Sequence, residues 1–240
     1  MAARLCVLSS MMLFALALVL APGSVAASDL QCNGELTGIT AANVTVPVGG
    51  SCSLSNSNVT GRVVAPAGSY FHAAHTRIAG DVVGSSAQTL FFDQHSTVGG
   101  SVRTSRVVQV FLFGARVHKN VKVDRTTDQV FICGSTVEHG SIQVTRSSRD
   151  IMIGGPRSDG CAGNSVRRGN MTVLRNTTDV QLVISGNRFP KGNLVVSGNT
   201  GSSPKVVQGN SGGKRIACQA NAPRFRASQN RRWKRGACKP

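Results

Sequence analysis

The amino-acid sequence predicts an all-β protein, a right-handed parallel β-helix (β-solenoid) with coils of about 20 residues that disulfides staple together. Three observations predict this fold: two short apolar motifs share one period, the apolar runs have strand composition, and the cysteine spacing follows the same period. After the N-terminal segment, no window has the i, i+3, i+4, i+7 spacing of an amphipathic helix. A β-sandwich or barrel, the main alternative, would show short strands without a fixed residue register.

The first motif is an aliphatic residue followed by a short, usually glycine-containing turn. Its regular copies begin at Val59, Ile78, Val98, Val117 and Val137, so the interval is about 20 residues throughout. The motif resumes at Val166 and Phe189 after longer gaps. Because such turns change the chain direction at a constant interval, the spacing predicts stacked coils.

The second motif is a run of two or three apolar residues that recurs in step with the first. Its copies are Tyr70-Phe71, Leu90-Phe91-Phe92, Val110-Phe111-Leu112, Val130-Phe131-Ile132, Ile151-Met152-Ile153 and Leu182-Val183-Ile184. β-Branched and aromatic runs bounded by Gly, Ser, Asn or Asp are typical of strands between turns. Coils stacked at about 4.8 Å would place the inward Val, Ile, Leu and Phe side chains in one continuous core.

The cysteines fit the same coil length. Beyond Cys6 in the N-terminal segment, the chain has six cysteines. Pairing neighbours gives two separations of one coil length, at the two ends, and a longer one in the middle. The predicted disulfides are Cys32–Cys52, Cys133–Cys161 and Cys218–Cys238. The first and last pairs would each tie a terminal coil to its neighbour, and the middle pair would enclose an inserted loop at residues 154–160.

Composition divides the chain into three parts. Residues 1–27 have the charge, apolar run and small-residue ending of a secretory signal peptide, residues 28–213 carry the β-helix repeats, and residues 214–240 form a basic capping segment. No later stretch is long and apolar enough to span a bilayer. We therefore expect a secreted or extracellular protein whose signal peptide is removed, in a compartment that permits disulfides.

The end of the chain resembles a known group of proteins. The residues concerned are Val207-Gln208-Gly209-Asn210, Gly213, Cys218, Asn221, Pro223, Asn230, Gly236 and Cys238. This pattern is similar to the closing segment of secreted bacterial right-handed parallel β-helix proteins of unassigned function. The resemblance implies the fold and export, and it implies little about activity. The segment departs from the group by its many arginines and by Trp233.

Three acidic residues are the best candidates for catalysis. Asp128, Asp150 and Asp179 each precede an apolar strand by one or two residues, so they could stack along one edge as in a polysaccharide lyase or hydrolase. Ser, Thr or Asn precedes each of them, which is typical of turns in which Asp bonds its own backbone. The turn interpretation is favoured, so the sequence assigns no catalytic residue and favours a non-enzymatic protein.

His75, His95 and Asp93 are the candidate metal ligands. His75 and His95 are one coil length apart and should lie one above the other, with Asp93 and His72 nearby. A metal needs three or four convergent ligands, so a surface ladder of imidazoles is the favoured interpretation. His118 and His139 lie a residue apart in register and are interpreted as incidental. The sequence predicts no metal and no cofactor.

The basic segment is the most distinctive chemical feature. The chain has a formal net charge of +17, and nine Lys or Arg residues with no Asp or Glu lie between Lys214 and Pro240. The candidate binding residues are Arg231, Arg232, Trp233, Lys234 and Arg235. Arginine pairs with phosphate, sulfate or carboxylate, and an aromatic ring can stack or lie on an interface. A solvated edge that blunts the end of the solenoid is the alternative.

Taken together, these features predict an exported, non-enzymatic β-helix scaffold that associates with an anionic polymer or a cell-surface component. The polymer could be a cell-wall polymer, an acidic polysaccharide, a nucleic acid or an anionic lipid surface. A polysaccharide lyase or hydrolase on the same fold is the alternative. Oligomeric state is not predicted from these features.

Overall fold

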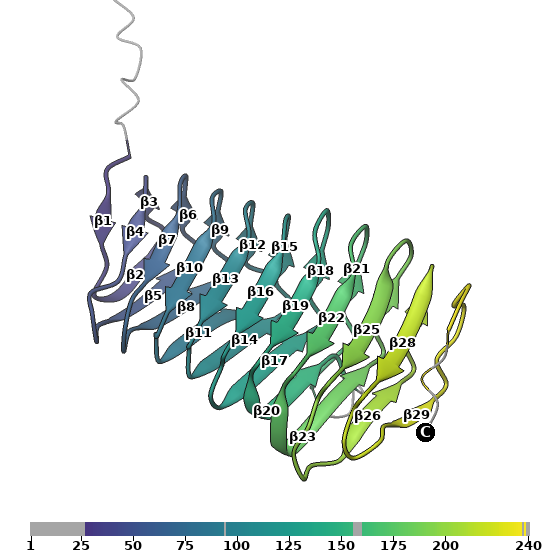
Figure 1. Ribbon diagram of the computed structural model, residues 1–240. Coiled ribbons are helices and arrows are strands. Elements are labelled where there is room, and N and C mark those ends of the chain that lie inside the picture. The colour runs from purple at the N-terminus through teal and green to yellow at the C-terminus, as the bar shows by residue number, and fades with distance from the viewer. Residues whose placement is uncertain (1–26, 94, 156–159, 237, 239–240) are drawn as a thin grey trace, which may run out of the picture.

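The computed structural model describes residues 27–93, 95–155, 160–236 and 238, and it is a parallel β-solenoid of about ten turns (Figure 1). The fold class is therefore confirmed. The right-handed sense stays a prediction, which rests on the strong preference of parallel β crossovers for that hand. The expected signal peptide lies, apart from Ala27, outside the described residues. Within those residues, we find no helix with the length and apolarity of a membrane span.

Three sheets of parallel strands run the length of the solenoid. Sheet A contains β1 (Leu30–Gln31), β4 (Val44–Thr45), β7 (Val63–Ala65), β10 (Val82–Ser85), β13 (Val102–Ser105), β16 (Val121–Asp124), β19 (Ile142–Thr145), β22 (Met171–Leu174), β25 (Asn193–Ser197) and β28 (Arg215–Gln219). Sheet B contains β2 (Gly34–Thr37), β5 (Ser51–Ser55), β8 (Tyr70–Ala74), β11 (Thr89–Asp93), β14 (Gln109–Phe113), β17 (Gln129–Cys133), β20 (Ser148–Ile153), β23 (Thr177–Ser185), β26 (Lys205–Gln208) and β29 (Arg226–Ser228). Sheet C contains β3 (Thr40–Ala41), β6 (Asn58–Val59), β9 (Arg77–Ile78), β12 (Thr97–Val98), β15 (Arg116–Val117), β18 (Thr136–Val137), β21 (Ser165–Val166), β24 (Arg188–Phe189) and β27 (Ser211–Gly212).

Each coil passes through sheet C, then sheet A, then sheet B, and the turns between them form three corners, named CA, AB and BC here. The first sequence motif corresponds to sheet C and the CA corner, and the second corresponds to sheet B. Equivalent residues of successive coils pair directly, as Val82 does with Val63 on one side and Val102 on the other. A residue type that recurs with the coil period therefore forms a straight row on the surface or in the core.

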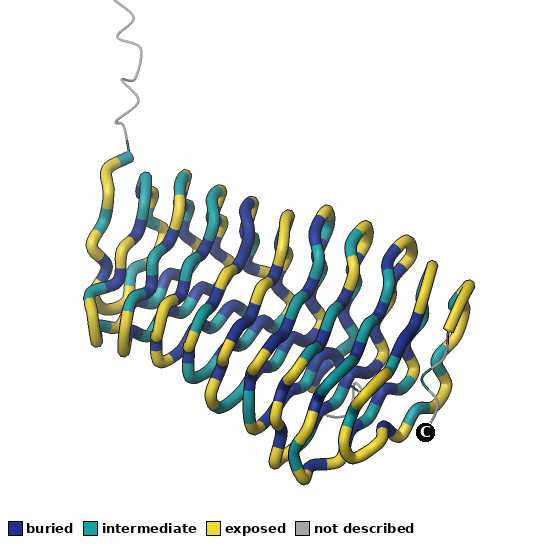
Figure 2. Tube along the Cα trace, in the orientation of Figure 1, coloured by how far each residue is buried: buried dark blue, intermediate teal, exposed yellow. Residues whose placement is uncertain are grey.

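The core fills the space that the three sheets enclose. Buried and exposed residues alternate along the strands in Figure 2, as the two-residue period of a strand requires. Along sheet B, one inward row consists of Phe71, Leu90, Val110, Val130, Ile151 and Leu182, all fully buried. The continuous apolar core predicted from the sequence is confirmed.

One inward position of this row holds a lysine. Lys205 takes the place next to Leu182 and is 1% exposed. Its ammonium donates to the carbonyl oxygens of Gly201 at 2.9 Å and Ser203 at 3.2 Å. Burial lowers the pKa of the Lys205 ammonium, because the charged form loses hydration.

Buried side chains hydrogen-bond from coil to coil at the corners. At the BC corner, the Asn164 amide donates to Asn187 Oδ1 at 3.0 Å, and the Asn187 amide donates to Asn210 Oδ1 at 2.9 Å. Asn210 in turn donates to Asn230 at 3.1 Å. Each amide also donates to a backbone carbonyl, as Asn187 does to Ile153 at 2.7 Å. These rows satisfy polar groups that the turns bury, and they hold the coils in register.

The three disulfides pair as the sequence predicts. Cys32–Cys52 and Cys218–Cys238, both 20 residues apart, each join a terminal coil to its neighbour. Cys133–Cys161, 28 residues apart, spans an insertion of which residues 156–159 lie outside the described residues. Three disulfides indicate that the protein folds in an oxidising compartment. The division at residue 213 follows composition, and sheets A and B continue across it through β28 and β29.

We expect the asparagine row to be a principal source of register. Replacing Asn187 with Ala leaves buried donors and acceptors of the neighbouring coils without partners, which costs about 1–3 kcal/mol of unfolding free energy. Asn170 makes a similar contact to Asn193 at 2.9 Å on the exposed CA corner, so Asn170→Ala is the matched control with a smaller loss. Urea unfolding measures both. Equal losses would show that the buried row has no special role.

Candidate anion-binding surfaces

A row of arginines, one from each of four consecutive coils, runs along the AB corner. The arginine row consists of Arg106, Arg125, Arg146 and Arg175, and all four are exposed. Each directly follows a sheet A strand, and β13, β16, β19 and β22 are in register, so the four positions are equivalent. Since neighbouring strands lie about 4.8 Å apart, the row offers one cation per coil at that interval.

The backbone of the arginine row is in the left-handed region. The φ angles of its four members are +56°, +55°, +52° and +54°. This conformation costs a non-glycine residue about 1 kcal/mol, whereas glycine adopts it freely. Gly198 holds the same position in the next coil. Ser86 holds it in the preceding coil, with a φ of +54°. The backbone of this corner therefore does not require arginine, and the four guanidinium groups are a feature of the sequence.

One carboxylate neutralises part of the row. Asp124 accepts from Arg146 at 2.8 and 2.7 Å and from Thr145 at 2.8 Å, and Arg125 lies 3.7 Å away. Burial acts to raise the pKa of Asp124, but these hydrogen bonds and the two arginine charges outweigh it and hold the pKa below its ordinary value. Among the described residues, Arg106 and Arg175 have no ion-pair partner, so the row keeps a net positive charge.

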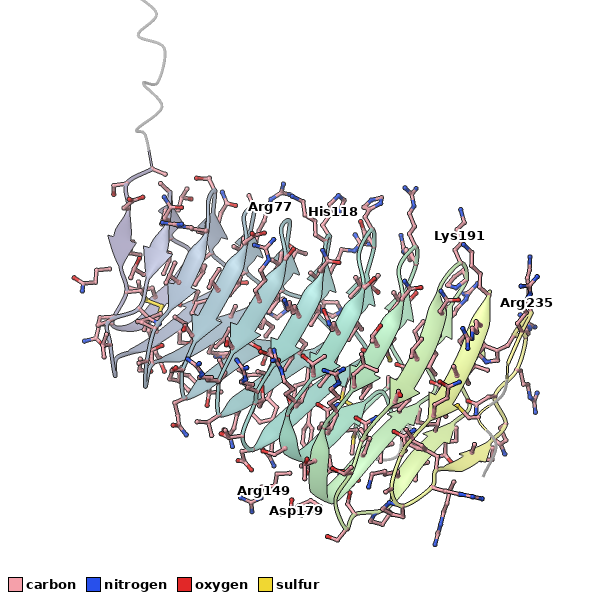
Figure 3. All side chains as sticks on the ribbon, in the orientation of Figure 1. Arg77, His118, Arg149, Asp179, Lys191 and Arg235 are labelled. Atoms are coloured by element: carbon pink, nitrogen blue, oxygen red, sulfur yellow. A yellow bond between two sulfur atoms is a disulfide. The ribbon has the colours of Figure 1, made fainter. Side chains whose placement is uncertain are left out.

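The basic segment forms the last coil and gathers a second group of cations. Arg235 pairs with Arg215 at the edge of sheet A. One surface hollow is lined by Asn193, Lys214, Arg215, Lys234 and Arg235. Arg231 and Arg232 are also exposed. Figure 3 shows Arg235 at the upper edge of the C-terminal end. Arg149, which follows Arg146 of the arginine row by three residues in the chain, projects from the lower edge (Figure 3). The two basic groups therefore lie on different parts of the surface.

Trp233 closes the C-terminal end of the core. Its ring lies 5.6 Å from the Phe189 ring, and a Cβ atom on Gly212 would overlap the indole. The glycine at this inward position leaves the space that the indole fills. Trp233 is thus engaged with the solenoid, and the four cations around it are the exposed candidates for a ligand.

Two of the three predicted acidic residues come together. Gln129 pairs with Asp150 across adjacent strands, which brings Asp128 beside Asp150. Burial raises the pKa of Asp150, the Asp128 charge raises it further, and a hydrogen bond from Gln181 and the Arg149 charge oppose them. Asp128 accepts from Gln109 at 2.9 Å and pairs with Arg149 at 3.4 Å.

Asp179 does not join this pair, contrary to the stacked edge that the sequence suggested. The register of β23 shifts so that Gln181, two residues later, faces Asp150. Asp179 lies in the shifted segment and is exposed. The extra residues at the start of this strand carry its carboxylate out of line.

The two histidines stack as a ladder, but among the described residues they do not converge with Asp93 on a metal site. The His75 and His95 rings lie 6.3 Å apart, as their spacing of one coil predicts. Asp93 instead pairs with His72 at 3.3 Å. Both ladder histidines have positive φ, so they occupy the strained turn position of the BC corner. Within the described residues, His75, His95 and Asp93 do not form a group of convergent ligands.

A different cluster forms where the sequence suggested an incidental offset. His118 Nδ1 lies 3.0 Å from Glu138 Oε2, and the His118 and His139 rings are 4.4 Å apart. The coil of Glu138 has one extra turn residue, which lets His139 follow His118 in the CA corner. The other oxygen of Glu138 holds Arg116 at 3.2 Å and Arg167 at 3.6 Å. Two guanidinium groups oppose a metal cation, so this cluster is best described as an ion-pair network.

The arginine row was missed in the sequence, although a signal was present. Each member stands four residues after the first residue of a sheet A strand, at Val102, Val121, Ile142 and Met171. Alignment on the sheet A strands would have shown it.

Comparison of the chain with protein-family models, curated proteins and solved structures finds no match. The proposed group of bacterial β-helix proteins therefore stays a resemblance.

The raised pKa of Asp150 makes a prediction about stability. A carboxyl whose folded pKa exceeds the ordinary value of about 3.9 stabilises the fold most below that value, and the stability falls as pH rises through the folded pKa. Asp150→Asn removes the charge and can still accept from Gln181. We expect it to melt higher than the parent at pH 7 and equally at a pH below about 4. Asp179→Asn, on an exposed neighbour, is the control; a lower melting temperature for Asp150→Asn at pH 7 would contradict the assignment.

Proposed function

We propose that this protein is an exported, non-enzymatic β-solenoid scaffold that binds a linear anionic polymer along the arginine row. The observation that carries the proposal is the occurrence of arginine at four consecutive strained positions where glycine would fit. A straight row of cations at a constant interval suits an extended polymer better than a compact anion. The net charge of +17 favours association with polyanions over long range.

The cations of the last coil supply a second contact in this proposal. Lys234 and Arg235 share a hollow with Lys214 and Arg215, and a carboxylate, sulfate or phosphate group would be surrounded there by donors. Arg231 and Arg232 lie on the same coil. The export part of the proposal is supported by the three disulfides, which require an oxidising compartment to form.

A polysaccharide hydrolase or lyase is the second candidate, and one observation favours it. Asp150, whose pKa burial raises, lies beside Asp128, and a pair of neighbouring carboxyl groups is what general acid–base cleavage of a glycosidic bond uses. Release of reducing ends from an acidic polysaccharide, abolished by Asp150→Asn, would establish this function in place of the scaffold.

The arginine row predicts a specific change in salt dependence. Arg106→Gly with Arg175→Gly removes the two members that pair with no acidic group among the described residues, and it relieves their left-handed strain. We expect the slope of log K against log salt for a short DNA duplex, used as a calibrated polyanion, to flatten by about two units. The unfolding free energy should not fall, because relief of about 1 kcal/mol per site offsets the entropy of the new glycines.

A matched control removes the same charge from another face. Arg77→Ser with Arg188→Ser changes two outward arginines of sheet C. The proposal expects a smaller change in slope from this pair. If both pairs reduce the slope equally, the protein binds polyanions through net charge alone and the row is not the site.

The last coil makes a separate prediction. Replacing Arg231, Arg232, Lys234 and Arg235 with Ser should flatten the same slope by about three or four units if each contacts one phosphate. The solenoid should stay folded, since these side chains lie outside the apolar core while Trp233 still covers it. Circular dichroism checks the fold. An unchanged affinity and slope would make these cations a solvated end of the solenoid only.

A further inference from the structure

We infer that the outer face of sheet B binds the pyranose rings of an acidic polysaccharide whose carboxylates the arginine row engages. This inference rests on the proposed function and names the class of polymer. It comes from an outward row of aromatic side chains, a row of amides beside it and the arginine row at the adjacent corner. All three rows follow the axis of the solenoid.

The aromatic row is an outward column of sheet B that pairing aligns. We call it the aromatic stripe, and it runs through His72, Phe91, Phe111, Phe131 and Met152. The His72 and Phe91 rings stack at 4.8 Å, and the Phe111 ring lies 5.7 Å from Phe91 and 5.6 Å from Phe131. Phe113 extends the stripe sideways, 6.1 Å from Phe111. Every member is half-buried, so the phenylalanine rings and the Met152 side chain are each partly exposed to solvent.

The stripe is confined to one face and to the middle coils. Among the described strand residues, all outward-facing aromatic side chains belong to sheet B. The same column begins with Glu35 and Ser53, and beyond Met152 it continues through Val183 and Val206 before it ends in Arg226. Outward strand positions need no aromatic side chain to keep the fold, since sheets A and C are built without them. A partly exposed aromatic patch bounded by polar residues is typical of a binding surface.

A polar row lies between the stripe and the AB corner. It consists of Thr89, Gln109, Gln129, Asp150 and Gln181. Neighbours are linked, as Thr89 donates to Gln109 at 3.2 Å and Gln109 donates to Gln129 at 3.4 Å. An amide offers a donor and an acceptor together, which is the set that vicinal sugar hydroxyls need. Stacking surface and hydroxyl partners are thus side by side on one sheet.

The arginine row borders the same strands. Its members precede β14, β17, β20 and β23, and the first stands three residues before Gln109. A further guanidinium group lies at this edge of sheet B, where Arg149 pairs with Asp128 at 3.4 Å. The coil interval of about 4.8 Å is close to the length of one pyranose ring, so a uronic acid polymer could place one ring and one carboxylate on each coil. Duplex DNA can bring phosphates to the arginine row, but it keeps its bases stacked inside and so offers no ring to the aromatic stripe.

The test measures affinity and salt slope for two polyanions of matched charge number, a galacturonic acid oligomer and inorganic polyphosphate. The variant is Phe111→Thr with Phe131→Thr, which keeps strand propensity and removes two adjacent rings of the stripe. Its matched control is Val83→Thr with Val195→Thr on the outer face of sheet A. We expect the galacturonate oligomer to bind more tightly than polyphosphate at equal salt. The phenylalanine variant should lose about tenfold in galacturonate affinity, with an unchanged salt slope and unchanged polyphosphate binding.

The outcomes separate the inference from the proposed function. If both polyanions bind equally and the phenylalanine variant matches the parent, the inference fails, while a slope flattened by the arginine-row variant would preserve the proposed function. If neither polyanion binds, both fail. Light scattering reports the parent and the variant; a dimer that the phenylalanine change dissociates would assign the stripe to a second copy and overturn the inference. A larger loss for single-stranded DNA than for galacturonate would identify a base-stacking surface and overturn it as well.

To keep folding out of the comparison, the thermal unfolding of each variant is measured. Because the stripe also packs ring against ring, a modest loss of stability is expected from the phenylalanine variant. Phe111→Leu with Phe131→Leu keeps an apolar surface and is the second variant. Its galacturonate affinity should lie between those of the parent and the threonine variant. If the leucine variant is as stable as the parent but binds no better than the threonine variant, the aromatic rings themselves are required.

Discussion

In-register stacking of equivalent coils is the constraint on which the rest of this structure depends. Each strand finds its backbone partners only in the coils before and after it, so a residue's place in one coil fixes its neighbours along the whole solenoid. Buried amides such as Asn187 and Asn210 extend this pairing into the corners. A change at one position is felt by the two adjacent coils, and any residue type that recurs with the period becomes a row.

The surface rows are consequences of the same constraint. Arg106 and its three equivalents occupy a corner position that favours glycine, and the backbone tolerates them because the stacked coils determine the turn. Phe111 and its neighbours lie on the solvent side of a strand, where packing does not demand them. Side chains that structure alone does not require, repeated at the coil interval, are the basis of the proposed polymer ligand.

Much of the fold could be predicted from periodicity. The sheet C and sheet B motifs, the apolar core and the two terminal disulfides follow from the constant coil length, and the middle disulfide follows from pairing the two cysteines that remain. The candidate site could be predicted only in part. The cations of the last coil stand out in composition, whereas Arg125 or Arg146 stands among ordinary turn residues. Asp179 does not stack on Asp150 as its sequence position suggested, because a shift in register that composition does not reveal carries it away.

By itself, the sequence determined the repeat, the strand composition, the cysteine pairing and the excess of positive charge, because each depends on spacing or counting along the chain. Only the tertiary structure decided which side of each strand faces solvent, which arginines share a corner and that His118 meets Glu138. The reason is physical: a one-residue difference in a turn or strand exchanges the inward and outward faces, and it is closure of the three sheets around one core that selects between them.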